Sequence, residues 1–485
     1  MSSGDRQVLK YLKPTLAGLL TSLSVAPFGF WILGPLGIAL LYRQLYNKTA
    51  RQRLLVGFLF ALGYFAISYL WVTSLVAAGY VVLVIFEALL TGIGTCLTKP
   101  PNLVRFAGVL TLVDAFRWTW PFGGMPMGSL ALGQAASPLG QLGRLGGPLL
   151  VEFVTILIGA AIGEATVRNH RPVGRYFVFG VLVVLVAVLV APDGGARVGT
   201  IRVAVVQGGG PRGLHAVFVN PALVTNRELV LTEKLKRSEH INLVLWPEDV
   251  ISLSEPLALS QIDQVMGNLA RRLNSTLEAG VTITTGSSQF YNQAVAWGPT
   301  GQVVGTYEKV HRVPFGEYVP DRSFFSHLGP TSLVPRDAIA GHGPAIFQPT
   351  TTARKNPEIF SLTRKLGVVI SFEVLFPGRA RSGITSGAQV LTVPTNDASY
   401  RSGQVPAQEV AADQLRAIEE GRDLVQAAPT GYSDLVSNRG AVIQRTPLGA
   451  ARVLIVSVPL REGRTIYSYL GDLPWVALLA IVALI

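Results

Sequence analysis

Long runs of apolar residues dominate the chain up to residue 191, and one more apolar run stands at its C-terminus. A helix crosses a hydrocarbon core of roughly 30 Å with about 20 residues, so most of these runs are long enough, although the first two are short. The pattern predicts seven membrane spans, at 12–27, 31–46, 54–72, 74–97, 103–120, 149–167 and 175–191. Leu473–Ile485 predicts the start of an eighth span, which is either truncated or continued in the natural protein.

The loops between these runs differ in positive charge. Cytoplasmic loops carry an excess of Lys and Arg. The loops on one side hold only Arg117 and Arg144, whereas the N-terminus and the loops on the other side hold twelve such residues. The twelve are Arg6, Lys10, Lys13, Arg43, Lys48, Arg51, Arg53, Lys99, Arg105, Arg168, Arg171 and Arg175. This bias predicts a cytoplasmic N-terminus, and seven crossings then place the chain after residue 192 outside the cytoplasm.

The region between the apolar runs has the pattern of a water-soluble domain. Short β-branched runs such as Ile201–Val206 and Leu366–Ile370 alternate with helical stretches such as 221–238 and 405–421. Alternation of this kind favours an α/β or mixed layered sandwich. We therefore expect a polytopic helical membrane domain at 1–198, an α/β domain at 199–466 and a C-terminal helical segment at 467–485.

Composition removes several classes of function. The formal net charge is +12, which topology-setting loops and contacts with anionic lipid explain. No soluble segment joins a basic patch to interleaved aromatic residues, so we expect no nucleic-acid partner. One cysteine, Cys96, excludes an intrachain disulfide. The sequence shows no metal-ligand cluster or nucleotide loop, and Gly208–Pro211 is interpreted as a turn, so we expect no cofactor.

Three segments of the α/β region place polar groups directly after apolar strands. They are Leu245-Trp246-Pro247-Glu248, the stretch from Tyr307 to Pro320 that contains Lys309 and Pro314-Phe315-Gly316-Glu317, and Gly367-Val368-Val369-Ile370-Ser371-Phe372-Glu373. Taken alone, Glu248 would be an ordinary ion-pair partner, Lys309 a surface lysine and Ser371 a buried strand serine. The three together, in this order, indicate a catalytic site.

These segments resemble the glutamate, lysine and nucleophile motifs of the carbon–nitrogen hydrolase (nitrilase) superfamily, in the form found in the apolipoprotein N-acyltransferase family. The resemblance covers nearly the whole chain. Further matches are Val206-Gln207-Gly208, Gly286, Tyr291-Asn292, Thr395-Asn396-Asp397, Arg416-Ala417, Glu419, Gly421-Arg422, Tyr467, Gly471-Asp472, and in the membrane half Arg117, Gly133-Gln134 and Glu152. It implies that the α/β domain is a nitrilase-like αββα sandwich.

The resemblance assigns roles position by position. Glu248 matches the general base, and Lys309 matches the lysine that stabilises oxyanion charge. Ser371 stands at the nucleophile position. Glu317 matches a further carboxylate of the family, and Glu373 matches the carboxylate two residues after the nucleophile.

The sequence departs from the family at the nucleophile, where the family has cysteine and this chain has Ser371. A thiol is partly ionised at neutral pH, whereas a hydroxyl needs strong activation. Either the serine is an engineered replacement that blocks turnover, which we favour because the neighbouring motifs are intact, or it is a natural variant. Phe372 stands where the family often has Tyr, and Tyr400 stands where Trp is usual. With Tyr318 and Asn396, Phe372 is expected to contact substrate.

The resemblance implies a ping-pong acyl transfer in the bacterial inner membrane. A phospholipid donates an acyl chain to position 371, and the α-amino group of the diacylglyceryl-cysteine of an apolipoprotein accepts it. Richness in Ala, Val, Gly and Arg suggests an actinobacterium, in which a polyprenol monophosphomannose synthase is a candidate partner. Two alternatives remain open: a membrane-tethered amidase or nitrilase that uses water, and a catalytically inactive scaffold that binds lipoprotein.

Overall fold

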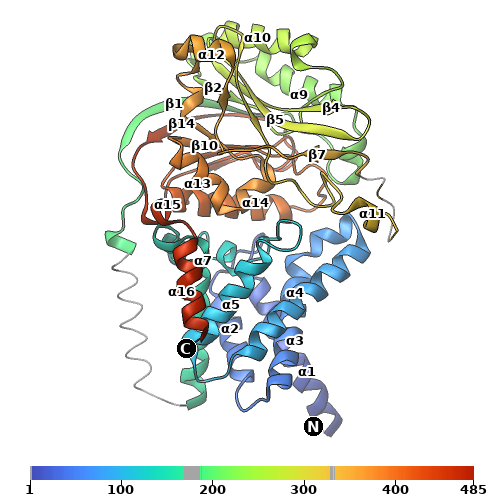
Figure 1. The fold of residues 1–485 in the computed structure, drawn as a ribbon, viewed down its shortest axis with the longest axis vertical. Coiled ribbons are helices and arrows are strands. Elements are labelled where there is room, and N and C mark those ends of the chain that lie inside the picture. The colour runs from blue at the N-terminus through green and yellow to red at the C-terminus, as the bar shows by residue number, and fades with distance from the viewer. Residues whose placement is uncertain (1–2, 169–185, 187, 328–330, 332–333, 485) are drawn as a thin grey trace. The chain divides into compact units, whose positions relative to one another are not determined.

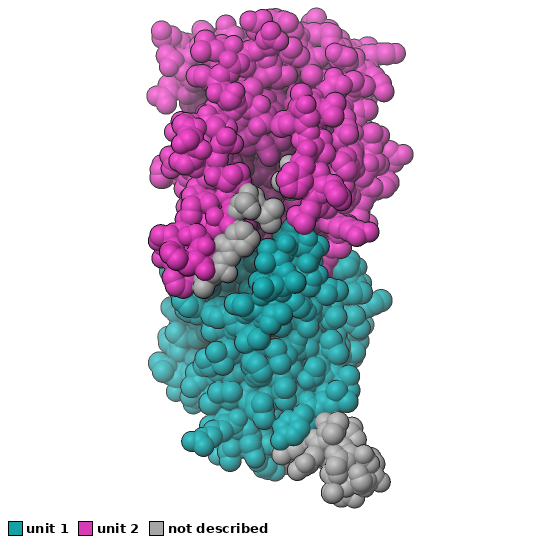
Figure 2. Space-filling model, turned by 90° about the vertical axis from the view of Figure 1, so that its right-hand side faces the viewer, with its two compact units in different colours: residues 1–193, 465–485 teal, residues 194–464 magenta. Residues whose placement is uncertain are grey.

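The computed structural model describes residues 3–168, 186, 188–327, 331 and 334–484. The chain divides into two compact units, which Figure 2 colours separately. Unit 1 comprises residues 1–193 and 465–485, and unit 2 comprises residues 194–464.

Unit 1 is built from helices (Figure 1). Its main described helices are α1 (Ser3–Ser22), α2 (Leu33–Gln44), α3 (Ala50–Ser68), α4 (Ala77–Leu97), α5 (Leu103–Arg117), α6 (Leu130–Gly133), α7 (Gly143–Arg168), α15 (Ile466–Leu470) and α16 (Leu473–Leu484). The 3-10 helices η1 (Leu70–Ser74) and η2 (Pro138–Leu142) lie between them. Thr49 begins α3 with a capping box, in which its hydroxyl accepts from the Gln52 backbone while the Gln52 side chain accepts from the Thr49 backbone.

Within the described residues, three helical segments are long and apolar enough to cross a membrane: Ala50–Ser68, Ala77–Leu97 and Pro138–Val167. These three segments correspond to the runs predicted at 54–72, 74–97 and 149–167, and the total of seven spans stays a prediction. Helix α2 has 12 residues and α5 has 15, so at 1.5 Å per residue neither reaches roughly 30 Å. The run predicted at 175–191 lies mainly outside the described residues, and α16 is a shorter apolar helix of 12 residues.

Small residues let the helices of unit 1 approach one another closely. A Cβ on Gly18 of α1 would lie 1.8 Å from the Phe60 carbonyl oxygen of α3, so only glycine fits there. Unit 1 also buries a charged pair. The Arg117 guanidinium lies 3.0 Å from Glu87 and donates to the Tyr69 hydroxyl at 2.7 Å. Charged groups inside a membrane domain are expected to be paired in this way.

Unit 2 contains two sheets. The larger has the order β14-β1-β2-β4-β5-β6-β8, with β3 beside β4 and β7 beside β5, and the smaller has the order β13-β12-β11-β10-β9. The strands are β1 (Arg197–Gln207), β2 (Leu243–Leu245), β3 (Ile251–Leu253), β4 (Thr276–Thr285), β5 (Gln289–Trp297), β6 (Val303–Glu308), β7 (Asp337–Ile339), β8 (Gln348–Pro349), β9 (Leu366–Val368), β10 (Val390–Pro394), β11 (Leu424–Ala427), β12 (Asp434–Val436), β13 (Val442–Arg445) and β14 (Arg452–Arg461).

Helices cover the outer face of each sheet (Figure 1). Helices α9 (Pro221–Glu233) and α10 (Gln261–Leu273) flank the larger sheet, and α13 (Pro377–Thr385) and α14 (Gln404–Glu420) flank the smaller. Shorter helical pieces fill the connections: α11 (Arg322–Phe325), α12 (Thr351–Lys355), and the 3-10 helices η3 (Leu214–Phe218), η4 (Arg237–Glu239), η5 (Leu257–Leu259), η6 (Pro357–Phe360), η7 (Thr363–Lys365) and η8 (Ser371–Leu375). The four layers confirm the expected αββα sandwich.

The parallel strands β1, β2 and β4 run through the buried centre of the larger sheet. Trp246, Met266 and Trp297 are buried completely in the core between this sheet and its helices. The two sheets also meet directly, since the Thr392 hydroxyl of β10 donates to Glu278 of β4 at 2.9 Å. Polar groups placed at the ends of these central strands are therefore held by a rigid frame.

Candidate functional site

The three polar segments follow strand ends in both sheets of unit 2. Glu248 follows β2 and Lys309 follows β6, whereas Ser371 follows β9 in the smaller sheet. Strand β10 and the residue after it link them, because Val369 N donates to Thr392 O at 3.0 Å and Glu248 N donates to Thr395 O at 3.3 Å. Residues about 120 positions apart in sequence are therefore brought to one region of the sandwich.

The backbone of Glu248 lies close to the backbone of Gly280 on the neighbouring strand β4. A Cβ added to Gly280 of β4 would lie 2.4 Å from the Glu248 Cα, so a side chain at residue 280 would displace the turn that carries the glutamate. Gly280 N also donates to Pro247 O at 3.0 Å. The absence of a side chain at Gly280 thus lets the Glu248 backbone lie directly against β4, which sets the position of the glutamate.

Lys309 lies between two carboxylates. Its ammonium is 2.7 Å from Glu248 Oε1 and 2.9 Å from Glu317 Oε1, and the lysine side chain is 1% exposed. Asn292 Nδ2 donates to the same two oxygens, at 2.8 Å to Glu248 and 2.7 Å to Glu317. Glu317 Oε2 accepts from Val313 N at 2.8 Å. The structure therefore joins Glu248, Lys309 and Glu317 in one buried charged centre.

The electrostatics of this centre keep both charge types in place. Burial raises the pKa of the Glu248 carboxyl, while the ammonium of Lys309 pulls it back down and leaves it above its ordinary value. Burial alone would lower the pKa of Lys309, but the carboxylates of Glu248 and Glu317 outweigh it and raise that pKa. Lys309 therefore stays an ammonium, and Glu248 is a better proton acceptor than an exposed glutamate.

One oxygen of Glu248 remains for chemistry. Its Oε1 accepts hydrogen bonds from the side chains of Lys309 and Asn292. Among the described residues no side chain donates to Oε2 within hydrogen-bond distance. An arrangement with one anchored and one open carboxylate oxygen is suited to accepting a proton from a nearby hydroxyl, thiol or amine.

Ser371 stands on a strained turn. It begins η8 with φ of +48°, in the left-handed region that residues with a side chain rarely adopt, and it is 6% exposed. Such outliers cluster at active sites, where the surrounding structure holds them in place. The observed backbone supports the interpretation of position 371 as a nucleophile site on a sharp strand-to-helix turn.

Glu373 ties the nucleophile turn to the lysine segment. Its carboxylate is fully buried and accepts from the backbone of Val310 at 2.8 Å, His311 at 3.0 Å and Ile370 at 2.9 Å. The Tyr307 hydroxyl donates to it at 2.8 Å. The Glu373 side chain is therefore occupied with holding the residues on either side of the site in register.

The remaining predicted residues line the loops around the charged centre. Phe372 packs edge-on against Phe376 at 5.1 Å, and the guanidinium of Arg312 lies 4.2 Å from the Tyr318 ring. Asn396 Oδ1 accepts from Ala398 N at 3.2 Å and so caps its own turn. These contacts place the three residues beside the site without bringing them into the Glu248–Lys309–Glu317 centre.

Asn292 is the functional residue that sequence reasoning did not assign. The sequence marks Asn292 only as part of the Tyr291-Asn292 match, because one asparagine in a strand carries no signature of its own. Besides its bonds to both carboxylates, its backbone oxygen accepts from Lys309 N at 2.9 Å. The signal that could have found it is its place on β5, the strand that pairs with the end of β6 just before Lys309.

Comparison with known proteins agrees with this geometry. Residues 17–161 match the model of the apolipoprotein N-acyltransferase N-terminal domain, and residues 202–467 match the carbon–nitrogen hydrolase model. The chain belongs to the apolipoprotein N-acyltransferase family. The family resemblance predicted from the three motifs is thereby confirmed, as is a membrane protein with several spans and a carbon–nitrogen hydrolase domain.

Individual relatives show how far the similarity extends. An apolipoprotein N-acyltransferase from Photobacterium profundum is 26% identical, over 94% of this chain and 90% of that protein. One from Azotobacter vinelandii is 28% identical, over 93% of this chain and 89% of that protein. Among solved structures, an amidase from Nesterenkonia sp. is 18% identical, covers 59% of this chain and 97% of its own, and has a TM-score of 0.38.

Proposed function

We propose that this protein is an apolipoprotein N-acyltransferase that moves an acyl chain from a phospholipid to the α-amino group of a diacylglyceryl-cysteine. The observation that carries the proposal is the buried Lys309 ammonium between Glu248 and Glu317, next to a nucleophile turn with positive φ. Family membership supplies the class of reaction, and this centre supplies groups that can perform it.

In the first half-reaction the nucleophile at position 371 attacks the ester carbonyl of the phospholipid, and Glu248 Oε2 takes its proton. The ammonium of Lys309 stabilises the oxyanion of the tetrahedral intermediate. The intermediate collapses with cleavage of the ester C–O bond, and Glu248 returns the proton to the departing lysophospholipid oxygen. The products are an acyl-enzyme at residue 371 and a lysophospholipid.

In the second half-reaction the acceptor amine attacks the acyl-enzyme and forms the amide bond. Glu248 takes a proton from the amine and passes it to the side-chain atom of residue 371 as the acyl bond breaks. Because the same carboxylate serves in both directions, the free enzyme is restored without any external proton donor. A thioester suits this step better than the ester formed by Ser371, so we propose that serine slows or blocks turnover.

The membrane topology fits a lipid reaction. The charge bias of the loops supports an extracytoplasmic unit 2 and a cytoplasmic N-terminus, in the inner membrane of a bacterium. Both substrates, the phospholipid and the diacylated lipoprotein, are then held in the outer face of that membrane. A nitrilase-like domain fixed to membrane helices confines its substrates to the same surface.

The test compares the full chain with its Ser371→Cys and Ser371→Ala variants in proteoliposomes. The donor is a phospholipid with a labelled acyl chain, and the acceptor is a diacylated lipopeptide. We expect labelled triacylated peptide from the cysteine form, with an acyl-cysteine adduct on the protein when acceptor is left out. The alanine form sets the background.

Other outcomes decide between the alternatives. Release of free fatty acid by the cysteine form at the same rate with and without acceptor would favour a hydrolase that uses water. Equal transfer by the parent chain and the cysteine form would mean that serine is a working nucleophile. Lipopeptide binding without transfer in any folded form would favour the scaffold.

A further inference from the structure

Arg379 of α13 is a buried cation that the acyl transfer described above does not use. Its side chain is 10% exposed, and its Nε lies 3.5 Å from Glu373 Oε1. Its Nη2 donates to the Tyr307 hydroxyl at 2.6 Å, and its Nη1 donates to Gly343 O at 3.1 Å. The Tyr307 hydroxyl donates in turn to Glu373 Oε2 at 2.8 Å. These contacts form a closed Arg379–Tyr307–Glu373 triangle, with side chains from α13, β6 and η8.

Arg379 sets the direction of the Tyr307 hydroxyl. A guanidinium can only donate hydrogen bonds, so the hydroxyl oxygen accepts from Arg379 and its single proton points to Glu373. Burial raises the pKa of the Tyr307 phenol, which therefore keeps that proton. Hydrogen bonds arranged in such a chain strengthen one another. Without Arg379, the hydroxyl could turn away from the carboxylate.

Glu373 passes this order on to the nucleophile turn. The oxygen that accepts from Tyr307 also accepts from Ile370 N at 2.9 Å. Ile370 directly precedes Ser371, which begins η8 with a φ of +48°. A backbone in this sparsely populated region persists only where the surrounding structure holds it. Arg379 therefore acts on Ser371 through the carboxylate of Glu373.

The same guanidinium holds the lysine segment from two sides. Tyr307 lies on β6, two residues before Lys309. On the other side, Gly343 O accepts from Arg379, and Gly341 N in the same loop donates to Lys309 O at 2.8 Å. A Cβ on Gly341 would lie 2.3 Å from a backbone oxygen of β6, so this loop lies directly against the strand end. One cation thus connects the nucleophile turn to both sides of the catalytic lysine.

A purely structural role for Arg379 would be to neutralise the buried charge of Glu373. That role predicts a loss of stability, with unchanged chemistry in the molecules that remain folded. The distances favour more than neutralisation. The contact of Arg379 with Glu373, at 3.5 Å, is longer than an N–H···O hydrogen bond of about 2.7–3.2 Å, whereas its 2.6 Å contact is with Tyr307. The shorter contact of the cation is therefore the one that orients the hydroxyl.

We propose that Arg379 is a positioning residue for acyl transfer, which acts through Tyr307 and Glu373 to hold the nucleophile turn at residue 371 in register with Lys309. The inference rests on the proposed function for its substrates, but its prediction for the reactivity of residue 371 does not. The turn and the lysine serve both half-reactions. Loss of Arg379 should therefore slow acylation of residue 371 and transfer to the amine by a similar factor, and should change KM for either substrate by less than about twofold.

The first experiment measures the reactivity of residue 371 without lipid. The full chain with Ser371→Cys, in detergent, is acylated by the short activated ester p-nitrophenyl acetate, and Ser371→Ala gives the background. We expect Arg379→Gln to slow acylation about 10- to 100-fold, the range that corresponds to loss of one charged hydrogen bond. Arg379→Lys should recover part of the rate, because an ammonium can still donate to the Tyr307 hydroxyl but lacks the planar fork.

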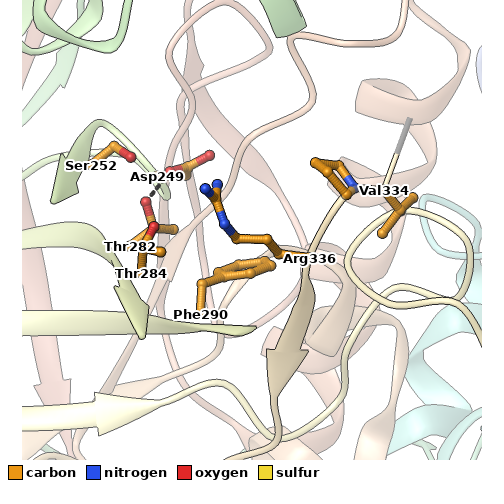
Figure 3. A pocket seen from close by; sticks show the side chains of 9 residues that line it. Asp249, Ser252, Thr282, Thr284, Phe290, Val334 and Arg336 are labelled. Carbon is orange, nitrogen blue, oxygen red and sulfur yellow. Dashed lines mark hydrogen bonds between the residues drawn. The ribbon is translucent and has the colours of Figure 1, made fainter. Parts of the chain in front are cut away.

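Two controls change polar side chains of unit 2 outside the triangle. Arg364→Gln removes an exposed arginine. Thr284→Val removes a hydroxyl from the pocket shown in Figure 3, and the lining residues of that pocket include no member of the triangle. Both should react with the ester at the rate of the parent cysteine form.

A double-mutant cycle tests whether Arg379 acts through Glu373. Arg379→Gln and Glu373→Gln are made singly and together in the cysteine form, and transfer from phospholipid to diacylated lipopeptide is measured in proteoliposomes. Residues that act as one unit are not additive, so kcat of the double variant should be within about threefold of that of Glu373→Gln alone. Tyr307→Phe, which removes only the hydroxyl, should reproduce most of the loss caused by Arg379→Gln.

Clear results overturn the proposal. Unchanged ester acylation and kcat in a folded Arg379→Gln variant would mean that Arg379 only balances a buried charge. Losses that multiply in the double variant, or a change confined to KM, would also reject a positioning role through Glu373. Ester acylation that depends on Arg379, without transfer to lipopeptide, would keep the positioning role and reject the proposed function. If Arg379→Gln does not fold, Arg379→Lys and Tyr307→Phe decide by the same criteria.

Discussion

Replacing Lys309 by methionine removes the cation that lies between two buried carboxylates. The lysine, Glu248 and Glu317 side chains are only 1%, 6% and 15% exposed, so water cannot replace the lost ammonium. Removing one partner of a buried ion pair costs about 3–5 kcal/mol, and we expect Lys309→Met to lower the free energy of unfolding of unit 2 by that amount at pH 8. Both carboxylates would remain on the single Asn292 amide.

The loss should depend on pH in a defined direction. Burial already raises the pKa of Glu248, and removal of the ammonium takes away the main influence that lowers it. A carboxyl whose pKa is higher in the folded protein than in the unfolded chain destabilises the fold as pH rises from the unfolded value, about 4.3, through the folded one. The penalty of Lys309→Met is therefore small near pH 4.5 and grows towards pH 8.

Unfolding is followed by tryptophan fluorescence of the full chain in detergent, at several pH values between 4.5 and 8. Adding Glu317→Gln to Lys309→Met removes one of the two facing charges and should restore part of the stability. Lys355→Met, at an exposed position, serves as control and should stay within about 0.5 kcal/mol of the parent. A Lys309→Met variant as stable as the parent at pH 8, or one whose penalty is the same at every pH, would refute the reasoning.

Three further changes test other parts of unit 2. Burial raises the pKa of Glu278 to about 8, so ionisation of this carboxyl group destabilises the fold as pH rises from about 4.3 to 8. Glu278→Gln should therefore be more stable than the parent by on the order of 3 kcal/mol in urea unfolding at pH 8, and most of this gain should be gone at pH 5. Glu373→Gln replaces an acceptor of three backbone N–H bonds, and in the cysteine form it should lower kcat far more than it changes KM; an unchanged kcat would reject a positioning role. Ser371→Gly relieves a positive φ and should be about 0.5–1 kcal/mol more stable than Ser371→Ala in thermal unfolding, whereas equal stability would mean that the turn is not strained.

The sequence was most informative where chemistry and local pattern coincide. The strand runs ending at Glu248 and at Ser371 could be predicted because β-branched residues precede a polar group at the end of a buried strand. The joining of Glu248, Lys309 and Glu317 was expected only from the family resemblance. Nothing in the spacing of these residues fixes a distance of 2.7 Å between side chains 61 positions apart.

The strand that leads into Lys309 is not predicted from the sequence. Strand β6, Val303–Glu308, contains Gly305 and Thr306 and has no strong apolar alternation, so its identity depends on pairing with β5 across the turn at 298–302. The role of Glu373 escaped prediction for a related reason. Its partners are backbone N–H groups of another segment, and backbone donors leave no mark in a sequence.

The membrane half shows the opposite difficulty. Apolar runs gave the approximate positions of α3, α4 and α7, but hydropathy does not report where a helix ends. Pro27 and Gly29 fall in the connection before α2, and Pro121 falls just after α5, so the apolar runs continue while the helices do not. In this part of the chain the apolar runs therefore extend beyond the ends of the helices that they contain.

Ser371 differs from the cysteine of the family in one atom, an oxygen in place of a sulfur. The turn holds Ser371 at a positive φ, Glu373 fixes the turn to the lysine segment, and Glu248 keeps one oxygen open beside the Lys309 ammonium. None of these features depends on whether the side chain of residue 371 ends in oxygen or sulfur. A hydroxyl must lose its proton to Glu248 during attack, and the pKa of that carboxyl, though raised, lies far below that of an alcohol. A thiol needs much less help, because part of it is ionised at neutral pH and sulfur is intrinsically nucleophilic. We therefore expect residue 371 to attack more readily as cysteine than as serine in this setting, and the Ser371→Cys comparison measures that difference.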